Sequence, residues 1–166
     1  MTTYIKRKSA KQEKRTAREF RGKTTPASGA LSGAKGDVRT GVRNGSYTNE
    51  NDFLIENKYT DKNFYPLKYS IWSKISNEAL NDNMRTPMMQ IDILGSSYVV
   101  LNSDDLESIT GLKYDKLINT DKLSYRMKQE ELDEYFGMRS VLGLEFKGKE
   151  KLAIMKKELF LDFRED

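Results

Sequence analysis

The alternation of hydrophobic and polar positions divides the chain into strand-like and helix-like stretches from residue 53 onward. Residues 67–80 place apolar side chains at helical spacing on one face, and Ser103 is a suitable N-cap for a short helix that runs to residue 109. The stretches with strand character are residues 53–60, 88–94 and 98–101. This order of elements predicts an α/β fold with one mixed central sheet flanked by helices.

The first fifty residues are more polar and are interrupted by glycine. Residues 9–20 have the pattern of a short helix with Ser9 as its N-cap, and residues 21–36, with four glycines and a proline, read as a loop. Residues 38–42 are a candidate strand. The Asn-Gly turn signal that follows them predicts that this strand pairs with residues 53–60 as a hairpin.

Residues 111–166 have a different character from the preceding part of the chain. Residues 124–136 read as an amphipathic helix, and residues 145–163 form a charged stretch that ends in apolar side chains. We expect residues 111–166 to form a helical extension that covers the domain or a partner. No internal repeat stands out in the sequence.

The composition narrows the possible chemistry. The 166 residues include no histidine and no cysteine, which excludes Ser-His-Asp and Cys-His catalysis, disulfides and ordinary zinc sites. A metal would have to be bound by carboxylate, carbonyl and water oxygens, and such ligands favour Mg²⁺, Mn²⁺ or Ca²⁺. We find no apolar stretch of spanning length and no signal peptide, so we expect no membrane association and a cytoplasmic location, in a bacterial or phage-infected cell.

Charge is distributed unevenly along the chain. Residues 1–50 carry twelve Lys or Arg and four Asp or Glu, whereas residues 51–166 carry seventeen and twenty-one, so the net charges are +8 and −4. A basic N-terminal part suits binding to a phosphate backbone. A solubilising basic tail is the alternative explanation.

Three carboxylates and one lysine in the first third of the chain are the strongest candidates for chemistry. Glu56 and Lys58 are two residues apart on an expected strand, so their side chains should point to the same face. Asp37 precedes the strand that should pair with it, and Glu13 lies on the expected first helix. Hard oxygen ligands and a nearby lysine are what a Mg²⁺-dependent phosphodiester hydrolase requires.

Each candidate also has a structural explanation that involves no catalysis. Asp37 could cap a turn, and Glu13 could take part in an ordinary ion pair within its helix. Glu56 could be solvated or could form a salt bridge with Lys58. Solvation of Glu56 is the weaker alternative, because the strand before it is apolar and an unpaired buried charge is costly.

Four segments in a fixed order resemble the PD-(D/E)xK nuclease superfamily, and more narrowly the archaeal-type Holliday junction resolvases and their phage-encoded relatives. The segments are Ser9-Ala-Lys-Gln-Glu13-Lys-Arg-Thr-Ala17, Lys23-Thr-Thr-Pro26-Ala-Ser28-Gly29-Ala30, Lys35-Gly36-Asp37-Val38 and Ile55-Glu56-Asn57-Lys58. The first resembles the helix that carries an early glutamate, the second a Ser-Gly loop, and the last two the motif aspartate and Glu-x-Lys. Each is weak alone, and the ordered set is more specific.

The resemblance covers roughly residues 9–106 and implies a restriction-endonuclease-like fold. It divides the chain into a basic flexible arm at residues 1–8, a nuclease core at residues 9–110 and the helical extension at residues 111–166. Two features depart from the family pattern. Relatives often have a serine shortly after Glu-x-Lys, where this chain has Asp61-Lys-Asn-Phe-Tyr65, and residues 111–166 have no counterpart in the family.

The resemblance also implies roles for individual residues. Asp37, Glu56 and the backbone carbonyl of Asn57 would bind Mg²⁺, with Mn²⁺ as a possible substitute, and Lys58 would contact the scissile phosphate and help to activate water. Glu13 would join the metal site directly or through water, and Glu19 is a less well matched competitor. The residues expected to contact DNA are Arg15, Arg18, Arg21, Lys23, Ser28 and Lys35.

The resulting hypothesis is a metal-dependent, structure-selective endodeoxyribonuclease. The resemblance implies a Holliday junction resolvase that works as a homodimer on branched DNA, because a symmetric dimer supplies two sites for paired cuts. A nuclease of the same fold that acts on nicked, flap, single-stranded or duplex DNA is the first alternative. The second alternative is a DNA-binding protein without catalysis, and a third is a structural interaction protein assembled through residues 111–166.

Overall fold

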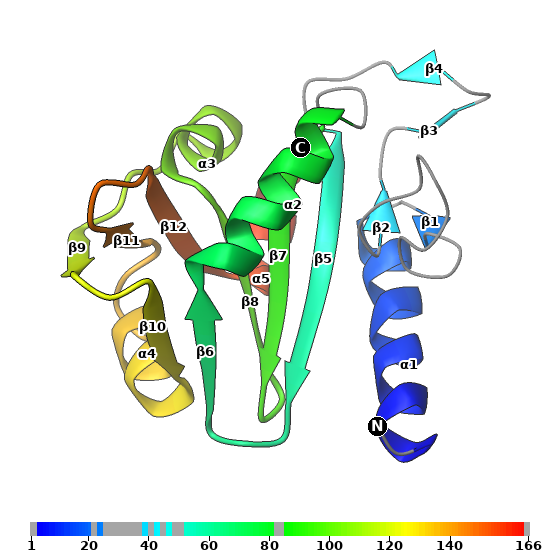
Figure 1. Cartoon of the computed structure of the whole chain (residues 1–166), viewed down its shortest axis with the longest axis horizontal. Coiled ribbons are helices and arrows are strands. Elements are labelled where there is room, and N and C mark those ends of the chain that lie inside the picture. Colours follow the sequence, from blue (N-terminus) through cyan, green and yellow to red (C-terminus); the bar gives the residue numbers. More distant parts are fainter. Residues whose placement is uncertain are drawn as a thin grey trace. The chain divides into compact units, whose positions relative to one another are not determined.

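The structure, a computed structural model, describes residues 3–20, 23–24, 38–39, 42–43, 46–47, 52–81 and 85–164. The helices are α1 (Thr3–Glu19), α2 (Tyr69–Asn81), α3 (Ser103–Thr110), α4 (Gln129–Phe136) and α5 (Lys157–Arg164). The strands are β1 (Lys23–Thr24), β2 (Val38–Arg39), β3 (Val42–Arg43), β4 (Ser46–Tyr47), β5 (Phe53–Thr60), β6 (Phe64–Lys68), β7 (Thr86–Ile93), β8 (Ser96–Asn102), β9 (Lys116–Thr120), β10 (Ser124–Lys128), β11 (Leu142–Phe146) and β12 (Lys151–Lys156). Within the described ranges, six strands come after α1, and from α2 onward successive helices are separated by two strands each (Figure 1).

The strands form one mixed eight-stranded sheet and two smaller ribbons. The order in the sheet is β1-β2-β5-β7-β8-β12-β11-β9, and the ribbons are β6 with β10 and β3 with β4. The predicted α/β class, with a mixed sheet flanked by helices, is therefore confirmed. The chain divides into two compact units, which we call the first unit (residues 1–58 and 74–88) and the second unit (residues 59–73 and 89–166).

In the first unit, β5 has its predicted bounds and is paired with β2. The pairing is antiparallel, with Val38 opposite Ile55, as predicted. The predicted strand 38–42 is wrong in its extent, because β2 is Val38–Arg39, and Val42 and Arg43 pair instead with Tyr47 and Ser46 in the β3·β4 ribbon. Phe53 and Leu54 have no exposed surface, and neither has Ile55. Successive side chains point to opposite faces, so the beginning of β5 is covered on both faces.

Helix α1 begins at Thr3 and not at the predicted N-cap Ser9, so the backbone of the predicted flexible arm is helical from Thr3 onward. Its buried face carries Gln12, Thr16 and Phe20, which are four residues apart and 4%, 0% and 0% exposed. This spacing brings the three side chains onto one stripe of the helix. The stripe fixes which side of α1 packs within the first unit.

The prediction that residues 111–166 form a helical extension is wrong, because they contain the four strands β9, β10, β11 and β12. Strand β12 lies between β8 and β11, and its residues 152–155 are all buried. A strand covered on both faces shows a continuous apolar run and not the alternation of a half-exposed strand. Residues 124–136 form a five-residue strand followed by a helix of eight residues. The apolar residues of the strand and of the helix together had a spacing that resembled one longer helix.

The structure shows an internal repeat that did not stand out in the sequence. The order β5-β6-α2-β7-β8-α3 recurs as β9-β10-α4-β11-β12-α5, and Thr60-Asp61-Lys62 recurs as Thr120-Asp121-Lys122. In the first copy, the Thr86 N–H donates to the Asp52 carbonyl at 2.8 Å, and the Leu94 N–H donates to the Thr60 carbonyl at 3.4 Å. In both bonds the donor and the acceptor are the same number of residues apart in the sequence. A constant sequence separation of this kind is expected when two strands run parallel. In the second copy, β9 and β11 are also parallel.

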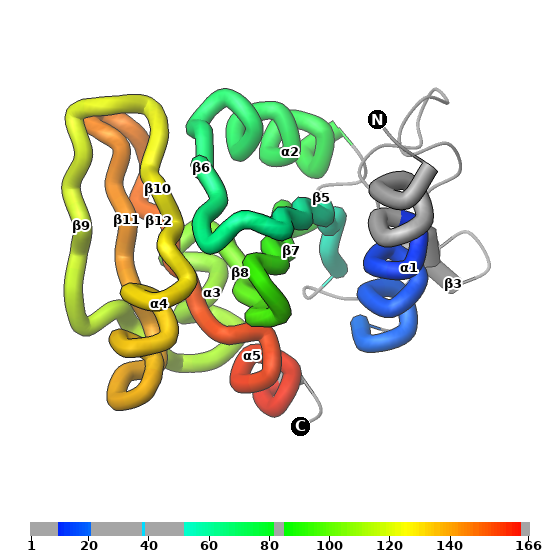
Figure 2. The backbone as a smooth tube through the Cα atoms, turned by 90° about the horizontal axis from the view of Figure 1, so that it is seen from below, coloured from blue at the N-terminus to red at the C-terminus, as the bar shows by residue number. Residues whose placement is uncertain are grey.

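Within the second unit, the β6·β10 ribbon has an approximate two-fold axis between its two strands. In the β6·β10 ribbon, Phe64 lies opposite Lys128 and Lys68 lies opposite Ser124. Position 64 of the first copy corresponds to position 124 of the second, and position 68 corresponds to position 128. Exchanging the two copies therefore converts one of these pairs into the other. The strands of the ribbon lie side by side in Figure 2.

Two hydrogen bonds at the ends of the ribbon follow the same symmetry. The Tyr69 N–H donates to the Leu123 carbonyl, and the Gln129 N–H donates to the Asn63 carbonyl, both at 3.0 Å. Each helix that follows the ribbon therefore begins against the turn of the other copy. Strands β8 and β12, the last strands of the two copies, are also paired antiparallel.

Polar contacts also join the two copies within the second unit. The Trp72 indole N–H donates to Glu150 at 2.8 Å, and the Tyr69 hydroxyl donates to the other oxygen of that carboxylate at 3.0 Å. Trp72 is 1% exposed. Helix α3 forms as predicted, except that Asn102 and not Ser103 is its N-cap, because the Asn102 side chain accepts from the Asp104 N–H. In the described part of the chain, no helix is both long and apolar enough to cross a bilayer.

Candidate active site

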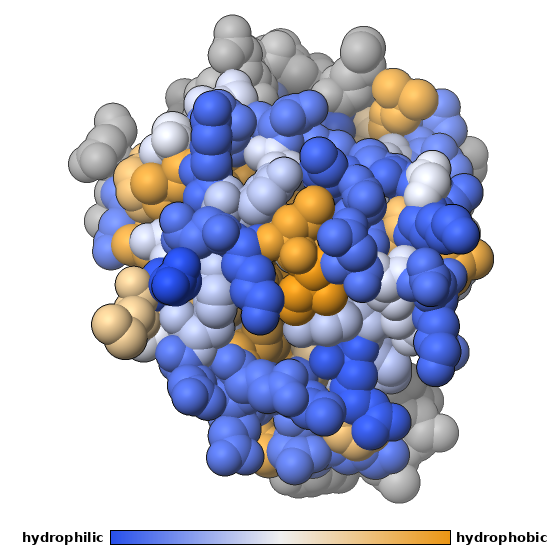
Figure 3. All heavy atoms as spheres, turned by 90° about the vertical axis from the view of Figure 1, so that its left-hand side faces the viewer, coloured by the Kyte–Doolittle hydropathy of each residue, from blue (hydrophilic) through white to orange (hydrophobic). Residues whose placement is uncertain are grey.

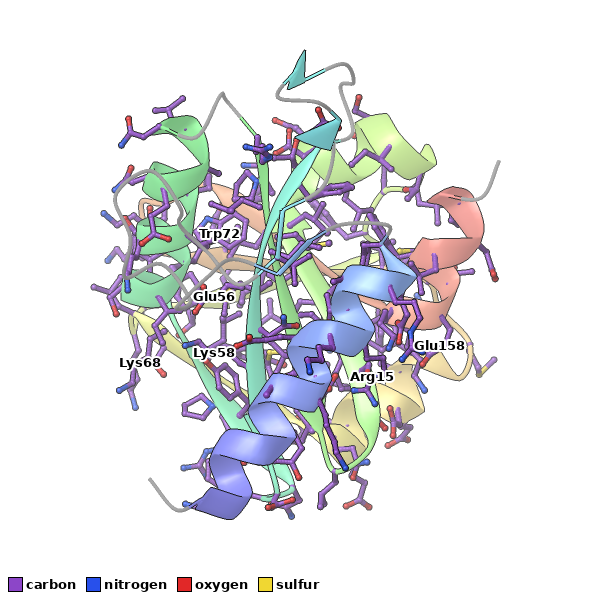
Figure 4. The ribbon with its side chains drawn as sticks, turned by 90° about the vertical axis from the view of Figure 1, so that its right-hand side faces the viewer. Arg15, Glu56, Lys58, Lys68, Trp72 and Glu158 are labelled. Atoms are coloured by element: carbon purple, nitrogen blue, oxygen red, sulfur yellow. The ribbon has the colours of Figure 1, made fainter. Side chains whose placement is uncertain are left out.

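Strand β5 presents Glu56 and Lys58 on one face, as the alternation of the sequence predicts. The Lys58 Nζ lies 3.4 Å from Glu56 Oε1, and the two side chains are 33% and 23% exposed, respectively. Figure 4 shows both side chains on the same side of the strand. The buried residues 53–55 immediately before them anchor the strand, so its polar end is held in place by its apolar beginning. Both side chains are partly exposed to solvent.

The residue between them, Asn57, points to the opposite face and holds α1. Its side-chain oxygen accepts a hydrogen bond from the Thr16 hydroxyl at 3.0 Å. One residue further, the Lys58 carbonyl accepts from the Gln12 side-chain amide at 2.9 Å. Helix α1 is therefore attached to β5 by two polar contacts that leave the face with Glu56 free of these bonds.

Sequence reasoning did not find Gln12 and Thr16. Both are polar residues on the stripe of α1 that also carries Ala17 and Phe20, and both are buried. Buried polar side chains are normally hydrogen-bonded, so polar residues on an apolar stripe are the signal that could have identified them. The spacing could not show that the partner is β5.

The acidic and basic candidates on α1 occupy different positions. Glu13 is half-buried and follows Gln12, which lies on the buried stripe of the helix. Glu19, its competitor, forms an ion pair with Arg15 at 3.5 Å, and the two side chains are 23% and 48% exposed. Arg18 is exposed. The role of Glu13 in a metal site stays a prediction.

Several predicted site residues lie outside the described residues. These are Asp37, Arg21, Ser28 and Lys35. Only the backbone of Lys23, in β1, is described. Within the described ranges, no three His, Cys, Asp or Glu side chains are grouped so that they could hold a metal ion. Asp37 lies outside these ranges, so the metal site also stays a prediction.

The second copy of the repeat does not carry an acid and a lysine at the corresponding positions. Thr60 corresponds to Thr120, so Glu56 corresponds to Lys116 and Lys58 corresponds to Ile118. Strand β9, which contains both, pairs with β11 as a regular parallel strand. Strand β9 therefore does not repeat the Glu56–Lys58 pair at the equivalent positions.

The structure reveals two further polar clusters in the second unit that sequence reasoning missed. The Asp92 carboxylate, 4% exposed, accepts from the Ser97 hydroxyl at 2.6 Å and from the Gln90 amide at 3.2 Å. The Asp133 carboxylate accepts from the Tyr98 hydroxyl at 2.6 Å. Burial and the hydrogen bond to Asp133 raise the pKa of Tyr98, so the phenol remains a donor.

Comparison with known proteins found no match for the chain, whether with family models, with curated proteins or with solved structures. What the protein does is therefore inferred from its own residues.

Proposed function

We propose that this protein is a metal-dependent, structure-selective endodeoxyribonuclease with a restriction-endonuclease-like core. We further propose that it hydrolyses phosphodiester bonds in branched DNA, as a Holliday junction resolvase does. The observation that carries the proposal is the pair Glu56 and Lys58, which share one accessible face of a strand whose beginning is buried. This strand is paired with β2, which begins directly after Asp37.

The pairing of β2 with β5 supports a joint role for Asp37 and Glu56. Val38 lies opposite Ile55. Asp37 is covalently joined to Val38, and Glu56 is covalently joined to Ile55. Consecutive Cα atoms are about 3.8 Å apart, so each acid lies one residue from a directly paired position.

The donor set suits a hard divalent cation. Asp37, Glu56 and the backbone carbonyl of Asn57 would hold Mg²⁺, or Mn²⁺ in its place, with Glu13 in direct or water-mediated contact. All of these donors are oxygen atoms, and Glu56 is accessible from solvent. When bound, the ion supplies Lewis acidity that makes a bound water more acidic and stabilises negative charge on phosphate oxygens.

Lys58 supplies a fixed positive charge beside the carboxylates. Its ammonium group lies 3.4 Å from Glu56, which orients the lysine along the face where a phosphate would lie. A cation at this position contacts the scissile phosphate and stabilises the negative charge that develops during hydrolysis. Lys58 could instead have only a structural role, as the partner of Glu56 in this ion pair. The cleavage assay has to separate the catalytic role from the structural one.

The rest of the first unit fits a DNA substrate. Arg15 and Arg18 are exposed on α1, the helix that is bonded to β5 through Thr16 and Gln12. Phosphate contacts of this kind provide affinity without sequence preference. Paired cuts in a four-way junction need two active sites, and a symmetric pair of chains would supply them. A homodimer is therefore part of the proposal.

The test is a cleavage assay on a panel of labelled DNA substrates, each with Mg²⁺ and with EDTA. The panel contains a four-way junction, a flap, a nicked duplex, a single strand and a linear duplex. We expect paired symmetric cuts in the junction that depend on Mg²⁺ and are lost in Glu56→Gln. Glu107→Gln is the matched control, because Glu107 also forms an ion pair with a lysine but lies on α3.

The outcomes separate the alternatives. Metal-dependent cuts in another substrate would keep the nuclease and replace the junction as its target. A stable DNA complex without cuts in Mg²⁺ or Mn²⁺ would refute catalysis and support a DNA-binding protein. Equal cleavage by Glu56→Gln and the wild type would show that the Glu56–Lys58 pair is structural.

A further inference from the structure

The β6·β10 ribbon has one face turned to the core of the second unit and one turned to solvent. Leu67 and Met127 are fully buried, and they alternate with the exposed residues Lys68, Arg126 and Lys128. Since successive side chains of a strand point to opposite faces, the exposed residues share the outer face of the ribbon.

The outer face of the ribbon is basic. Its six positions carry Phe64, Pro66, Lys68, Ser124, Arg126 and Lys128, and none of them is acidic. The guanidinium group of Arg126 lies 4.5 Å from the centre of the Phe64 ring. Stacking on an aromatic ring holds an arginine in an extended position while its N–H groups stay available to a partner.

The turns at the two ends of the ribbon repeat the same arrangement. The Lys62 N–H donates to the Thr60 hydroxyl at 3.1 Å, and the Lys122 N–H donates to the Thr120 hydroxyl at 3.2 Å. Both lysines are exposed. Each turn therefore adds a cation to an end of the basic face.

Carboxylates near the ribbon offset part of its charge. Asp61 accepts a hydrogen bond from the Tyr59 hydroxyl, and Asp121 precedes Lys122 in the other turn. Lys128 lies 3.6 Å from Glu131, but both side chains are more than half exposed, and such surface pairs are weak. Residues 59–69 and 119–129 together contain five Lys or Arg and two Asp. The face of the molecule on which β9 and β10 lie is mostly hydrophilic, with an apolar patch near its middle (Figure 3).

We propose that the outer face of the β6·β10 ribbon binds duplex DNA, with Lys68, Arg126 and Lys128 on the phosphates. This inference rests on the proposed function for its choice of DNA, but it concerns residues outside the Glu56–Lys58 site. A two-stranded ribbon fits the major groove.

The symmetry and the spacing of the cations favour duplex DNA over an acidic protein segment. The two-fold axis exchanges Lys68 with Lys128, and the backbones of a duplex are likewise related by two-fold axes. Lys68 lies opposite Ser124, four residues from Lys128. A rise of about 3.4 Å per residue and a strand spacing of about 4.8 Å place the two Cα atoms about 14 Å apart. The major groove is about 12 Å wide, so both lysines can reach the phosphates that border it.

The experiment compares two triple variants of the full chain. The ribbon variant is Lys68→Gln/Arg126→Gln/Lys128→Gln, and the control is Lys113→Gln/Lys147→Gln/Lys151→Gln, which removes the same charge from exposed lysines elsewhere in the second unit. Binding to a labelled duplex of random sequence is measured by fluorescence anisotropy in EDTA over a range of salt concentrations. Circular dichroism and thermal unfolding check that both variants fold.

We expect the ribbon variant to bind at least about tenfold more weakly than the wild type, and the control to stay within a few-fold of it. Each phosphate contact contributes about 0.9 to the slope of log affinity against log salt concentration, so the loss of three contacts should lower that slope by about 2.7. The single variants Lys68→Gln and Lys128→Gln should each lower it by about 0.9, and these keep the test available if the triple variant does not fold.

Each result supports or overturns the inference. An unchanged salt slope in the ribbon variant, or an equal loss of DNA affinity in the control variant, would overturn the inference. The proposed function would still stand in that case if the wild-type protein binds and cuts DNA. If the ribbon changes weaken binding to a polyglutamate peptide and not to DNA, the surface serves an acidic protein partner. If the wild-type protein neither binds nor cuts any DNA, the proposed function itself fails.

Discussion

Replacement of Tyr98 by phenylalanine tests how the two copies of the repeat are held together in the second unit. The Tyr98 side chain lies on β8 of the first copy, and its hydroxyl donates to Asp133, on α4 of the second copy, at 2.6 Å. Asp133 also accepts from the Ser96 hydroxyl at 3.0 Å and lies 3.3 Å from Lys156 Nζ. The substitution removes one donor and leaves the ring in place.

The expected loss of stability follows from the exposure of the two groups. Tyr98 is fully buried, whereas the Asp133 side chain is 36% exposed. A hydrogen bond to a charged group contributes about 1.5–3 kcal/mol, and water can replace part of the lost donor at a partly exposed carboxylate. We therefore expect Tyr98→Phe to lower the free energy of unfolding by about 1.5 kcal/mol, the lower end of that range.

The effect should depend on pH in a defined direction. Burial raises the pKa of Asp133, but hydrogen bonds from Tyr98 and Ser96 and the charge of Lys156 outweigh it, so the net pKa is below its ordinary value. A carboxyl with a lowered pKa in the folded state adds stability that is present above its unfolded pKa, near 4. That stability is lost as the pH falls through the folded value. The difference between Tyr98→Phe and the wild type should therefore shrink in acid.

Urea denaturation followed by circular dichroism, at neutral pH and below pH 4, measures both effects. Tyr135→Phe is the control, because its hydroxyl donates to the neutral Val141 carbonyl at 2.8 Å. We expect that variant to lose about 1 kcal/mol with little dependence on acid. Equal stability of Tyr98→Phe and the wild type at neutral pH, or a difference that persists unchanged in acid, would refute the reasoning.

Four further substitutions test the site and the scaffold. Glu56→Gln should abolish cleavage in gel assays while DNA affinity stays equal or increases, since a charge that repels phosphate is removed; wild-type cleavage would refute the assignment. Lys58→Met should slow cleavage about a hundredfold or more in single-turnover assays, and an unchanged rate would limit Lys58 to its ion pair. Leu67→Ala, at a fully buried position of the ribbon, should cost about 2–5 kcal/mol in urea denaturation. Glu150→Gln should cost about 1–2 kcal/mol, monitored by the fluorescence of Trp72, the single tryptophan, and an unchanged midpoint would show that the Glu150 charge adds nothing.

The part of the fold that was predicted well is the part whose local pattern is unambiguous. Residues 53–60 form β5 with the predicted bounds, because a run of apolar residues followed by alternating polar ones has strand character without help from distant contacts. Helix α2 follows the predicted spacing and shifts only at its ends. Residues 151–156 were missed because a short stretch of charged and apolar residues can form a strand or part of a helix, depending on what it packs against. Here it pairs with β8 and β11 in the sheet and therefore forms a strand.

The candidate site shows the same division. Alternation along a strand was sufficient to place Glu56 and Lys58 on one face, and their 3.4 Å separation confirms this geometry. The attachment of α1 to β5 through Gln12 and Thr16 joins residues more than forty positions apart in the chain. Such contacts depend on the packing of the helix against the strand, which no local pattern specifies.

By itself, the sequence determined the α/β class, the position of β5 and the face shared by its acid and its lysine, because side-chain periodicity follows from backbone geometry. The tertiary structure alone decided that residues 111–166 repeat the preceding scaffold and that β6 pairs with β10. The two copies have few identical residues, and what relates them is strand pairing between distant segments. The basic ribbon therefore exists only in the folded chain, where pairing brings Lys68, Arg126 and Lys128 onto one face.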